Sequence, residues 1–295
     1  MRTVTAAALQ CSFVEDQATN LDKVESSVRD AARAGATLVL PPELFASLYF
    51  CKDEQPRHFA RAETLEDSIV VKRFAALAGE LGVVMPISFF ERAGKSFFNS
   101  VAVADATGEV LGVYRKSHIP DGPGYEEKFY FSPGDTGFRV FSTKVGVVGV
   151  GICWDQWFPE CARTMALLGA EILCYPTAIG SEPQDPDLDT SGHWQRVMQG
   201  HAAANMMPLV ASNRVGHEVG EPTESTFYGC SFLADETGAI VSEAGRSQDA
   251  IVTARFELDA LAEKRASYGL FRDRRPDLYG SLLTLDGQSS VHRGF

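Results

Sequence analysis

Cys153 is the cysteine whose position in the sequence best suits a nucleophile. It ends an apolar, glycine-interrupted run from Val145 to Cys153, which is typical of a buried strand, and a helix is predicted to begin near Pro159. A thiol at this strand-to-helix corner would lie close to unpaired backbone N–H groups and to the positive end of a helix. Both favour a thiolate and an oxyanion that forms beside it. The alternative is that Cys153 is a small buried apolar side chain, as free cysteines commonly are.

A cysteine nucleophile needs a general base, and the sequence around Cys153 contains no histidine, which is the usual partner. A carboxylate with a lysine is the other solution. Glu43 follows the short apolar run Thr37–Leu40 and two prolines, so it would lie just past the carboxyl end of a parallel strand, where ligands bind in α/β sheets. Lys116 follows the predicted strand Val110–Tyr114 and could balance the charge on the attacked oxygen. Taken alone, each residue would be a solvated surface charge.

Signatures of several other chemistries are absent from the sequence. It has no G-x-S-x-G, G-x-G-x-x-G or H-E-x-x-H motif. Gly94-Lys95-Ser96 lacks the earlier glycine of a phosphate loop and is better explained as a hairpin turn. His193 and His201 are not accompanied by an acidic residue at metal-ligand spacing. We therefore expect neither a metal nor a cofactor.

Composition limits the class of protein. The 295 residues are 45% hydrophobic and 22% charged, which is ordinary for a large globular domain. The net charge of -12 disfavours a nucleic-acid partner, and no apolar run approaches the ~20 residues that span a bilayer. The first ten residues do not resemble a secretory signal. The six cysteines form no C-x-x-C pair, so we expect reduced thiols in a soluble, cytoplasmic protein with no membrane contact.

Apolar periodicity predicts that strands and helices alternate in the first third of the chain. The pattern indicates a strand, a helix, a second strand, a second helix and a hairpin, so that the sheet is mixed rather than wholly parallel. Asn20 is the expected cap of the first helix, which should stop near Gly35. The other expected bounds are Val4–Gln10 and Thr37–Leu40 for the strands, Glu66–Leu81 for the second helix, and Val83–Phe90 with Phe97–Ala104 for the hairpin.

Two pairs of segments repeat along the chain at nearly equal offsets. Gly35–Pro42 resembles Gly169–Pro176, and Asp105–Gly108 resembles Asp235–Gly238. A duplicated strand and helix unit would give two sheets, each covered by helices on one face, whose bare apolar faces pack together. We therefore predict an α/β fold, a four-layer α-β-β-α sandwich with internal pseudo-symmetry.

The chain is expected to divide into one domain, residues 1–266, and a C-terminal extension, residues 267–295. The extension is rich in charge, Gly and Ser and shows little periodicity. We expect it to pack on the domain or on a neighbouring subunit, and we therefore expect a homo-oligomer.

Three ordered motifs resemble the signatures of the nitrilase superfamily of carbon-nitrogen hydrolases. They are Pro42-Glu43, the RKSHIP segment that contains Lys116, and the GICWD segment that contains Cys153. The resemblance spans nearly the whole chain. Longer segments are similar to those of the N-carbamoylputrescine amidohydrolases within that superfamily: KSHIPDGPGYEEKFYFSPGDTGF from Lys116, ICWDQWFPE from Ile152 and YPTAIGSEPQ from Tyr175.

The resemblance implies a role for each residue. Cys153 would be the thiol nucleophile, Glu43 the general base and Lys116 the cation that stabilises the oxyanion. The second glutamate of the superfamily falls on Glu127, with Glu126 as the adjacent alternative. The implied reaction is hydrolysis of N-carbamoylputrescine through a cysteine-linked thiocarbamate to putrescine, carbon dioxide and ammonia, a step from arginine by way of agmatine.

The residues around the nucleophile suggest how a cationic ureido substrate would be selected. Trp154 and Asp155 follow Cys153, and an acidic, aromatic wall suits a protonated amine and repels a carboxylate. We expect Trp154, Asp155, Glu182 and Tyr49 to bind substrate, with the alternative that Asp155 only caps the following helix. Other N-carbamoyl compounds such as N-carbamoyl amino acids, simple amides and nitriles stay open, as does a non-catalytic binding protein on the same fold.

Overall fold

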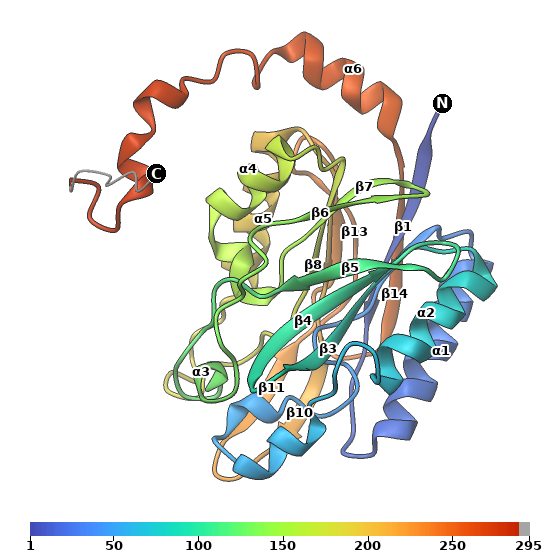
Figure 1. The fold of residues 1–295 in the computed structure, drawn as a ribbon, viewed down its shortest axis with the longest axis vertical. Helices are drawn as coiled ribbons and strands as arrows, with labels where there is room; N and C mark the ends of the chain where they lie inside the picture. Colours follow the sequence, from blue (N-terminus) through green and yellow to red (C-terminus); the bar gives the residue numbers. More distant parts are fainter. Residues whose placement is uncertain (289–295) are drawn as a thin grey trace.

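Two six-stranded arrays of strands lie face to face in the computed structural model, which describes residues 1–288 (Figure 1). In the first array β14-β1-β2 and β3-β4-β5 are joined by a bridge between Leu38 and Val84. The second has the order β13-β12-β9-β8-β7-β6. The strands of the first are β1 (Thr3–Gln10), β2 (Leu38–Leu40), β3 (Met85–Ala93), β4 (Ser96–Ala104), β5 (Val110–Arg115) and β14 (Ala250–Glu257). Those of the second are β6 (Val140–Thr143), β7 (Gly146–Val150), β8 (Ile172–Pro176), β9 (Leu209–Ser212), β12 (Phe232–Ala234) and β13 (Ile240–Glu243).

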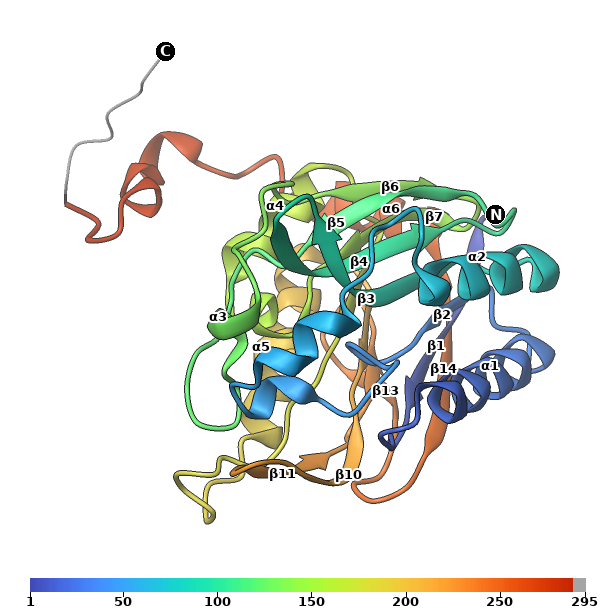
Figure 2. The same cartoon turned by 60° about the horizontal axis from the view of Figure 1, so that its bottom comes forward.

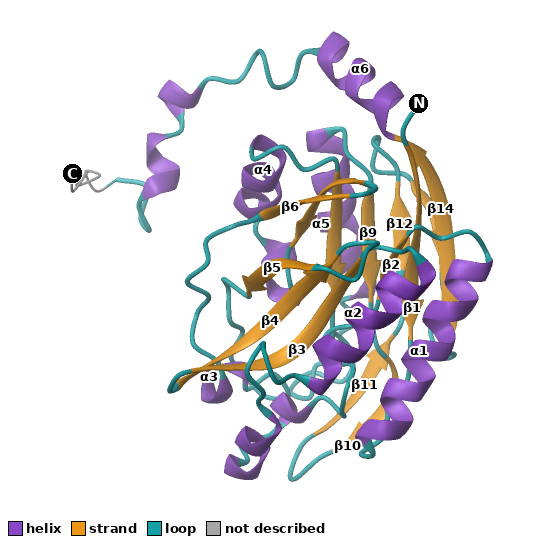
Figure 3. Cartoon of the chain, turned by 45° about the vertical axis from the view of Figure 1, so that its right-hand side comes forward, coloured by secondary structure: helices purple, strands orange, loops and turns teal. Residues whose placement is uncertain are grey.

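Helices cover the outer face of each array, as Figures 2 and 3 show. The first is covered by α1 (Gln17–Arg33) and α2 (Ile69–Leu81), and the second by α4 (Pro159–Leu167) and α5 (Ser191–Asn205). The remaining elements are α3 (Glu127–Tyr130), α6 (Leu258–Tyr268), the hairpin β10 (Val215–Val219) with β11 (Glu224–Tyr228), and short 3-10 turns at Phe50–Lys52, Pro56–Arg61, Cys153–Trp157, Pro276–Leu278 and Gly280–Leu283. The predicted α-β-β-α sandwich is confirmed.

Alternation along the strands explains the layers. In β1, Ala6 and Ala8 belong to the core between the two arrays, whereas Ala7 and Leu9 belong to the core under α1 and α2. Successive side chains of a strand point to opposite faces, so a strand buried on both faces must be apolar throughout. Small alanines on the inner face let the arrays approach closely.

The pseudo-symmetry is also confirmed. The order β1-α1-β2-α2-β3-β4-β5 corresponds to β7-α4-β8-α5-β9-β12-β13. The repeated turns match as well: the amide of Gly108 donates to the carbonyl of Asp105 at 2.8 Å, and that of Gly238 to Asp235 at 3.0 Å. Each half also contributes one strand to the opposite array. β6, which follows the first half, pairs with β7, and β14, which follows the second half, pairs with β1. The β10–β11 hairpin has no counterpart in the first half, where β3 and β4 are joined by a tight turn.

The predicted start of the first helix is wrong. Asp16 caps it by accepting the amide of Thr19 at 2.8 Å, and Asn20 lies inside the helix, buried, with its side chain bonded to the backbone of Val14. The second helix is capped by Ser68 rather than starting at Glu66. The cap of the first helix lies one turn before the expected residue, and the cap of the second lies two residues after the expected start; each side chain accepts a free N–H of the first turn.

The end of the chain leaves the body of the domain. After α6 the chain turns at Gly269, which has φ +83°, and residues 269–288 form an arm that projects outward (Figures 1 and 2). Residues 289–295 of the predicted extension lie outside the described residues. Over residues 1–288, none of the helices combines the length and the apolar character that crossing a bilayer requires.

Candidate active site

The four residues expected to do chemistry lie together where strands end. Glu43 lies three positions after β2, Lys116 directly follows β5, Cys153 lies three positions after β7, and Glu127 begins α3. The amide of Glu43 donates to the carbonyl of Thr177, which follows β8, at 3.3 Å. The ends of the two arrays therefore meet at the site, and neither array could form it alone.

Lys116 joins two buried carboxylates. Its Nζ lies 2.9 Å from Glu43 Oε1 and 2.7 Å from Glu127 Oε2, and all three side chains are fully buried. Asn99 Nδ2 donates to the same Glu43 oxygen at 2.6 Å, and the Tyr49 hydroxyl donates to Glu127 Oε1 at 2.6 Å. Glu43 Oε2 is buried and has no hydrogen-bond partner among the described residues. One oxygen of Glu43 is thus held, and the other is available as a proton acceptor.

The charges in this cluster decide its protonation. Burial alone would lower the pKa of Lys116, but the carboxylates of Glu127 and Glu43 raise it well above its usual value. Burial raises the pKa of Glu127, with the charge of Glu43 adding to the effect and Lys116 opposing it. The two neighbouring carboxyl groups therefore hold Lys116 in its charged form despite its burial.

Cys153 occupies a strained corner beside the cluster. Its φ is +40°, in the left-handed region that a residue with a Cβ seldom adopts, and its Sγ–H points to the carbonyl of Ala178 at 3.7 Å. Burial raises the pKa of the thiol well above its usual value; the charge of Glu43 raises it further, and Lys116 opposes this. We expected this corner to favour a thiolate, and for the resting protein that expectation is wrong. The positive end of α4 lies six residues further on, at Pro159, and the nearby carboxylates of Glu43 and Glu127 disfavour a second negative charge. The thiol needs a base.

A cavity of about 170 Å³ opens onto Cys153. Its wall includes the carboxyl side chains of Asp121 and Glu182 and the rings of Tyr125, Trp154 and Trp157, and the described lining contains no lysine or arginine. Glu182 is half-buried and bonded to Gln184 at 3.2 Å, and burial raises the pKa of its carboxyl. The cavity can hold a small, slender molecule with one cationic end.

A family model described as carbon-nitrogen hydrolase matches residues 5–266. The chain belongs to the carbon-nitrogen hydrolase family. An N-carbamoylputrescine amidase of Solanum tuberosum is 56% identical over 294 residues, with 98% of each chain covered. A citrullinase of Francisella tularensis is 54% identical, covering 96% of this chain and 99% of that one. A crystal structure of a carbon-nitrogen hydrolase from Helicobacter pylori G27 matches with a TM-score of 0.90 and 38% identity, over 96% of this chain and 99% of that one.

The structure does not place Asp155 in the substrate cavity of this carbon-nitrogen hydrolase. Its carboxylate is fully buried; one oxygen accepts the backbone N–H of His118 at 3.0 Å, and the other accepts the Tyr114 hydroxyl at 2.8 Å and the amide of Ile152 at 3.0 Å. The prediction that Asp155 meets the substrate is therefore wrong, because its acceptor sites are already used. Asp155 instead ties the Cys153 corner to the segment that follows Lys116.

The other expected substrate-binding residues separate into two groups. Trp154, 39% exposed, and Glu182 line the cavity with Cys153. Tyr49 is fully buried and is not part of the described lining of the cavity, and its hydroxyl donates to Glu127. A role in holding the carboxylate therefore fits Tyr49 better than direct contact with substrate.

Sequence reasoning missed Asn99 and Tyr125. Asn99 holds Glu43, and the Tyr125 hydroxyl accepts the amide of Gly180 at 2.9 Å in the cavity wall. A signal for Asn99 was present, since an amide inside the apolar run Phe97–Ala104 must be buried and must find a partner. Tyr125 carried no such signal because it lies in an irregular loop.

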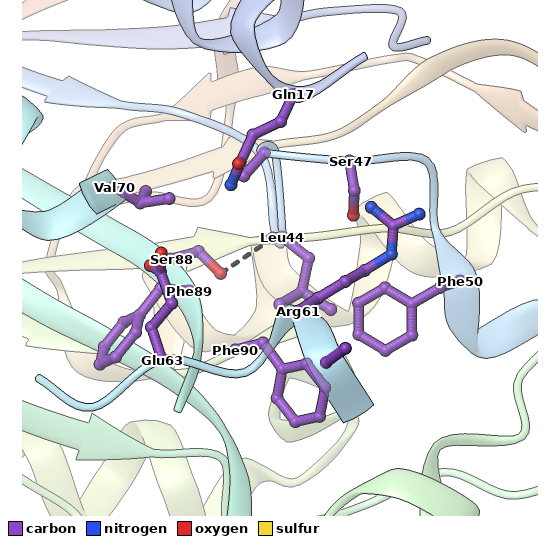
Figure 4. Close-up of a pocket in the computed structure, with 12 residues that line it drawn as sticks. Gln17, Leu44, Ser47, Phe50, Arg61, Glu63, Val70, Ser88, Phe89 and Phe90 are labelled. Carbon is purple, nitrogen blue, oxygen red and sulfur yellow. Dashed lines mark hydrogen bonds between the residues drawn. The ribbon is translucent and has the colours of Figure 1, made fainter. Parts of the chain in front are cut away.

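A second cavity, of about 230 Å³, lies behind the loop that carries Glu43 (Figure 4). Leu44, Ser47, Phe50 and Phe90 are among its lining residues, and Cys153 is not. The described lining of this second cavity contains none of Glu43, Lys116, Glu127 and Cys153, so the cavity at Cys153 is the candidate active site.

Proposed function

We propose that this chain hydrolyses N-carbamoylputrescine to putrescine, carbon dioxide and ammonia. The observation that carries the proposal is the cavity at Cys153, whose charged wall residues Asp121 and Glu182 are both acidic. Such a cavity suits a ureido group at the thiol and a protonated amine at the other end. The N-carbamoylputrescine amidases at 55–56% identity support the same substrate.

The first half of the reaction forms the covalent intermediate. Glu43 Oε2 takes the proton of Cys153, and the sulfur attacks the ureido carbon. Lys116 Nζ and the backbone N–H that follows Cys153 stabilise the oxyanion, and a single lost donor of this kind costs ~10²–10³ in rate. Glu43 returns its proton to the terminal nitrogen, which leaves as ammonia. A thiocarbamate on Cys153 results.

The second half releases the enzyme. Glu43 takes a proton from water, whose oxygen attacks the thiocarbamate carbon, and the sulfur leaves and recovers a proton from Glu43. The carbamate released loses carbon dioxide and gives putrescine. Glu127, held by Tyr49, keeps Lys116 charged and aimed at the oxyanion through both steps.

A second candidate substrate is another ureido compound, such as citrulline. The citrullinase at 54% identity favours it. Citrulline carries a carboxylate in addition to its amine, and the described lining of the cavity offers that group no lysine or arginine. The acidic wall therefore supports the diamine-derived substrate.

The remaining expectations form part of the same proposal. The product places the enzyme in polyamine biosynthesis, by way of agmatine, and the reduced state of all six cysteines supports a cytoplasmic location. We infer a homo-oligomer in which the extension 267–295, beyond the 1–266 domain, packs on a second copy. Exposed leucines at 278, 282 and 283 on the projecting arm support this inference.

The decisive experiment measures ammonia released by purified enzyme. The panel is N-carbamoylputrescine, citrulline, N-carbamoyl-β-alanine, a simple amide and a nitrile. We expect the largest kcat/KM for N-carbamoylputrescine. A larger value for citrulline would transfer the assignment to that substrate, and absence of turnover on the whole panel would support a binding protein.

A further inference from the structure

The β10–β11 hairpin, which breaks the pseudo-symmetry of the fold, presents a buried ion pair to the loop that carries Glu43. Arg214 directly precedes β10, Glu218 lies within it, and both are buried. Their side chains lie 3.0 Å apart, from Arg214 Nη1 to Glu218 Oε1. Neither residue has a part in the reaction described above.

Arg214 uses its guanidinium to gather the backbone of the loop. Its Nη2 donates to the carbonyls of Glu43 at 3.0 Å and Leu44 at 2.5 Å, and its Nη1 donates to that of Ser47 at 2.9 Å. The rigid fork of donors on an arginine can hold several acceptors at fixed directions, which a lysine cannot do. Three carbonyls of one turn therefore point at one side chain.

The backbone of this loop needs such a restraint. Leu44 has φ +48°, a conformation that costs a non-glycine residue free energy and persists only when its surroundings impose it. On the opposite side its amide donates to Ser88 Oγ at 2.9 Å (Figure 4). Arg214 and Ser88 thus hold the residue next to the general base from two sides.

Glu218 extends the same restraint to the second carboxylate of the site. Its Oε2 accepts the amide of Tyr49 at 2.6 Å, and the hydroxyl of Tyr49 donates to Glu127 Oε1 at 2.6 Å. The Arg214–Glu218 pair therefore contacts the loop at both of its ends, residues 43 and 49. Through these contacts it is linked to Glu43 and Glu127, the two carboxylates that flank Lys116.

We propose that the Arg214–Glu218 pair positions the general base Glu43 and, through Tyr49, Glu127. They are positioning residues, since the described lining of the cavity at Cys153 contains neither of them. A buried ion pair is weak evidence for stability, because desolvation of the two charges offsets their attraction. The contacts of this pair go to the loop that carries the base, so we expect its loss to be felt in the chemical step.

The test compares Glu218→Ala and Glu218→Gln with a control, Asp53→Ala. Asp53 is a second buried carboxylate that holds the same hairpin, and within residues 1–288 its two oxygens accept hydrogen bonds from the backbone amides of Glu221 and Thr223 rather than from the loop 43–49. Each variant is measured for melting temperature, for kcat and KM with N-carbamoylputrescine, and for the alkylation rate of Cys153 by iodoacetamide at pH 7.

Misplacement of a catalytic group by ~1 Å costs roughly 10²-fold in rate. We therefore expect Glu218→Ala to lower kcat by about 10- to 100-fold with KM within about threefold of wild type. Glu218→Gln keeps one acceptor oxygen, so its kcat should lie between that of wild type and that of Glu218→Ala. The Asp53→Ala control should lose melting temperature but keep kcat. Alkylation at pH 7, where Glu43 must take the proton, should slow in the Glu218 variants and keep the wild-type rate in the Asp53→Ala control.

Because the inference rests on the proposed function, the alkylation measurement separates the two. If wild type fails to turn over N-carbamoylputrescine, the proposed function is lost, and the pH 7 alkylation rates still decide the role of the pair. If Glu218→Ala does not fold, Glu218→Gln and Arg214→Lys provide the comparison. Retention of kcat in the folded Glu218 variants, or alkylation rates equal to those of the control at pH 7, would overturn the proposal.

Discussion

The thiol of Cys153 rests protonated, because burial and the neighbouring carboxylates raise its pKa. Its reactivity must therefore come from a partner rather than from its own acidity. Among residues 1–288, Glu43 Oε2 is a buried acceptor without a hydrogen-bond partner, while Oε1 is held by Asn99 and Lys116. Glu43 therefore has one oxygen engaged in hydrogen bonds and a second oxygen that can accept the proton of Cys153.

Cys153→Ala should abolish turnover and leave the melting temperature close to that of wild type, because it removes the proposed nucleophile and only one sulfur atom. Mass spectrometry after brief exposure to iodoacetamide should find Cys153 labelled first. The other five cysteines are buried and none lines the substrate cavity. Faster labelling of Cys51 or Cys161, with activity retained, would refute the assignment.

Glu43→Gln and Lys116→Ala should each lower kcat by at least about 10³, as expected for residues that act as a unit. Glu127→Gln should be severely impaired because it leaves Lys116 without its bidentate partner. The adjacent Glu126→Gln is the matched control and should keep most of the activity, since Glu126 is partly exposed. Steady-state kinetics of the four variants provide the check; the reverse result for the adjacent glutamates would show the register to be wrong.

Glu182→Gln should reduce kcat/KM for N-carbamoylputrescine by at least about 30-fold. Loss of one partner from a desolvated charge pair costs ~2–5 kcal/mol. The same variant should change kcat/KM little for N-butylurea, which has similar length and no charge. Competition assays with both substrates measure the ratio, and an equal loss for the two would mean that Glu182 shapes the cavity rather than binding the amine.

At the scale of elements, the strand and helix order was predictable because apolar periodicity reports burial directly. The helix starts were not predictable, because Asp16 and Asn20 are both residue types that cap helices. Only the folded structure shows that Asp16 accepts the amide of Thr19 and that the side chain of Asn20 instead accepts the amide of Val14. The Glu43 and Lys116 positions followed from strand ends. Asp155 was misplaced because sequence order does not show which way a side chain points at a corner. The contacts of Arg214 were not predictable either, because they join segments that lie far apart in the chain.

Helix α5 carries a histidine that should make stability depend on pH. Burial lowers the pKa of His201 to about 4. The unfolded chain, with a pKa near the usual 6.5, then binds more protons than the folded chain between these values, so stability is lost as pH falls from about 6.5 to 4. The full difference is about 3 kcal/mol. Urea titrations at pH 7 and pH 4.5 should show a loss about 2 kcal/mol smaller in His201→Gln than in wild type; equal losses would contradict this account.

At the scale of the whole molecule, the arm after α6 exposes apolar side chains that a solitary chain would leave in water. Leu278, Leu282 and Leu283 are each more than 60% exposed. We expect light scattering at micromolar concentration to return a multiple of 32.1 kDa, and a variant ending at Tyr268 to give a smaller assembly. A full-length monomer would contradict the inferred oligomer.

The pairing of β1 with β14 has a consequence for how the chain is made. All eight residues of β1, from Thr3 to Gln10, pair with residues 250–257, which are synthesised at least 240 residues later. Until then β1 has an open edge, and unpaired strand edges invite association with other chains. Contacts this distant in sequence also slow folding. A nascent chain of this protein must therefore leave the β14 side of its first strand open or protected until residues 250–257 have been made, even though β2 can already pair on the other side.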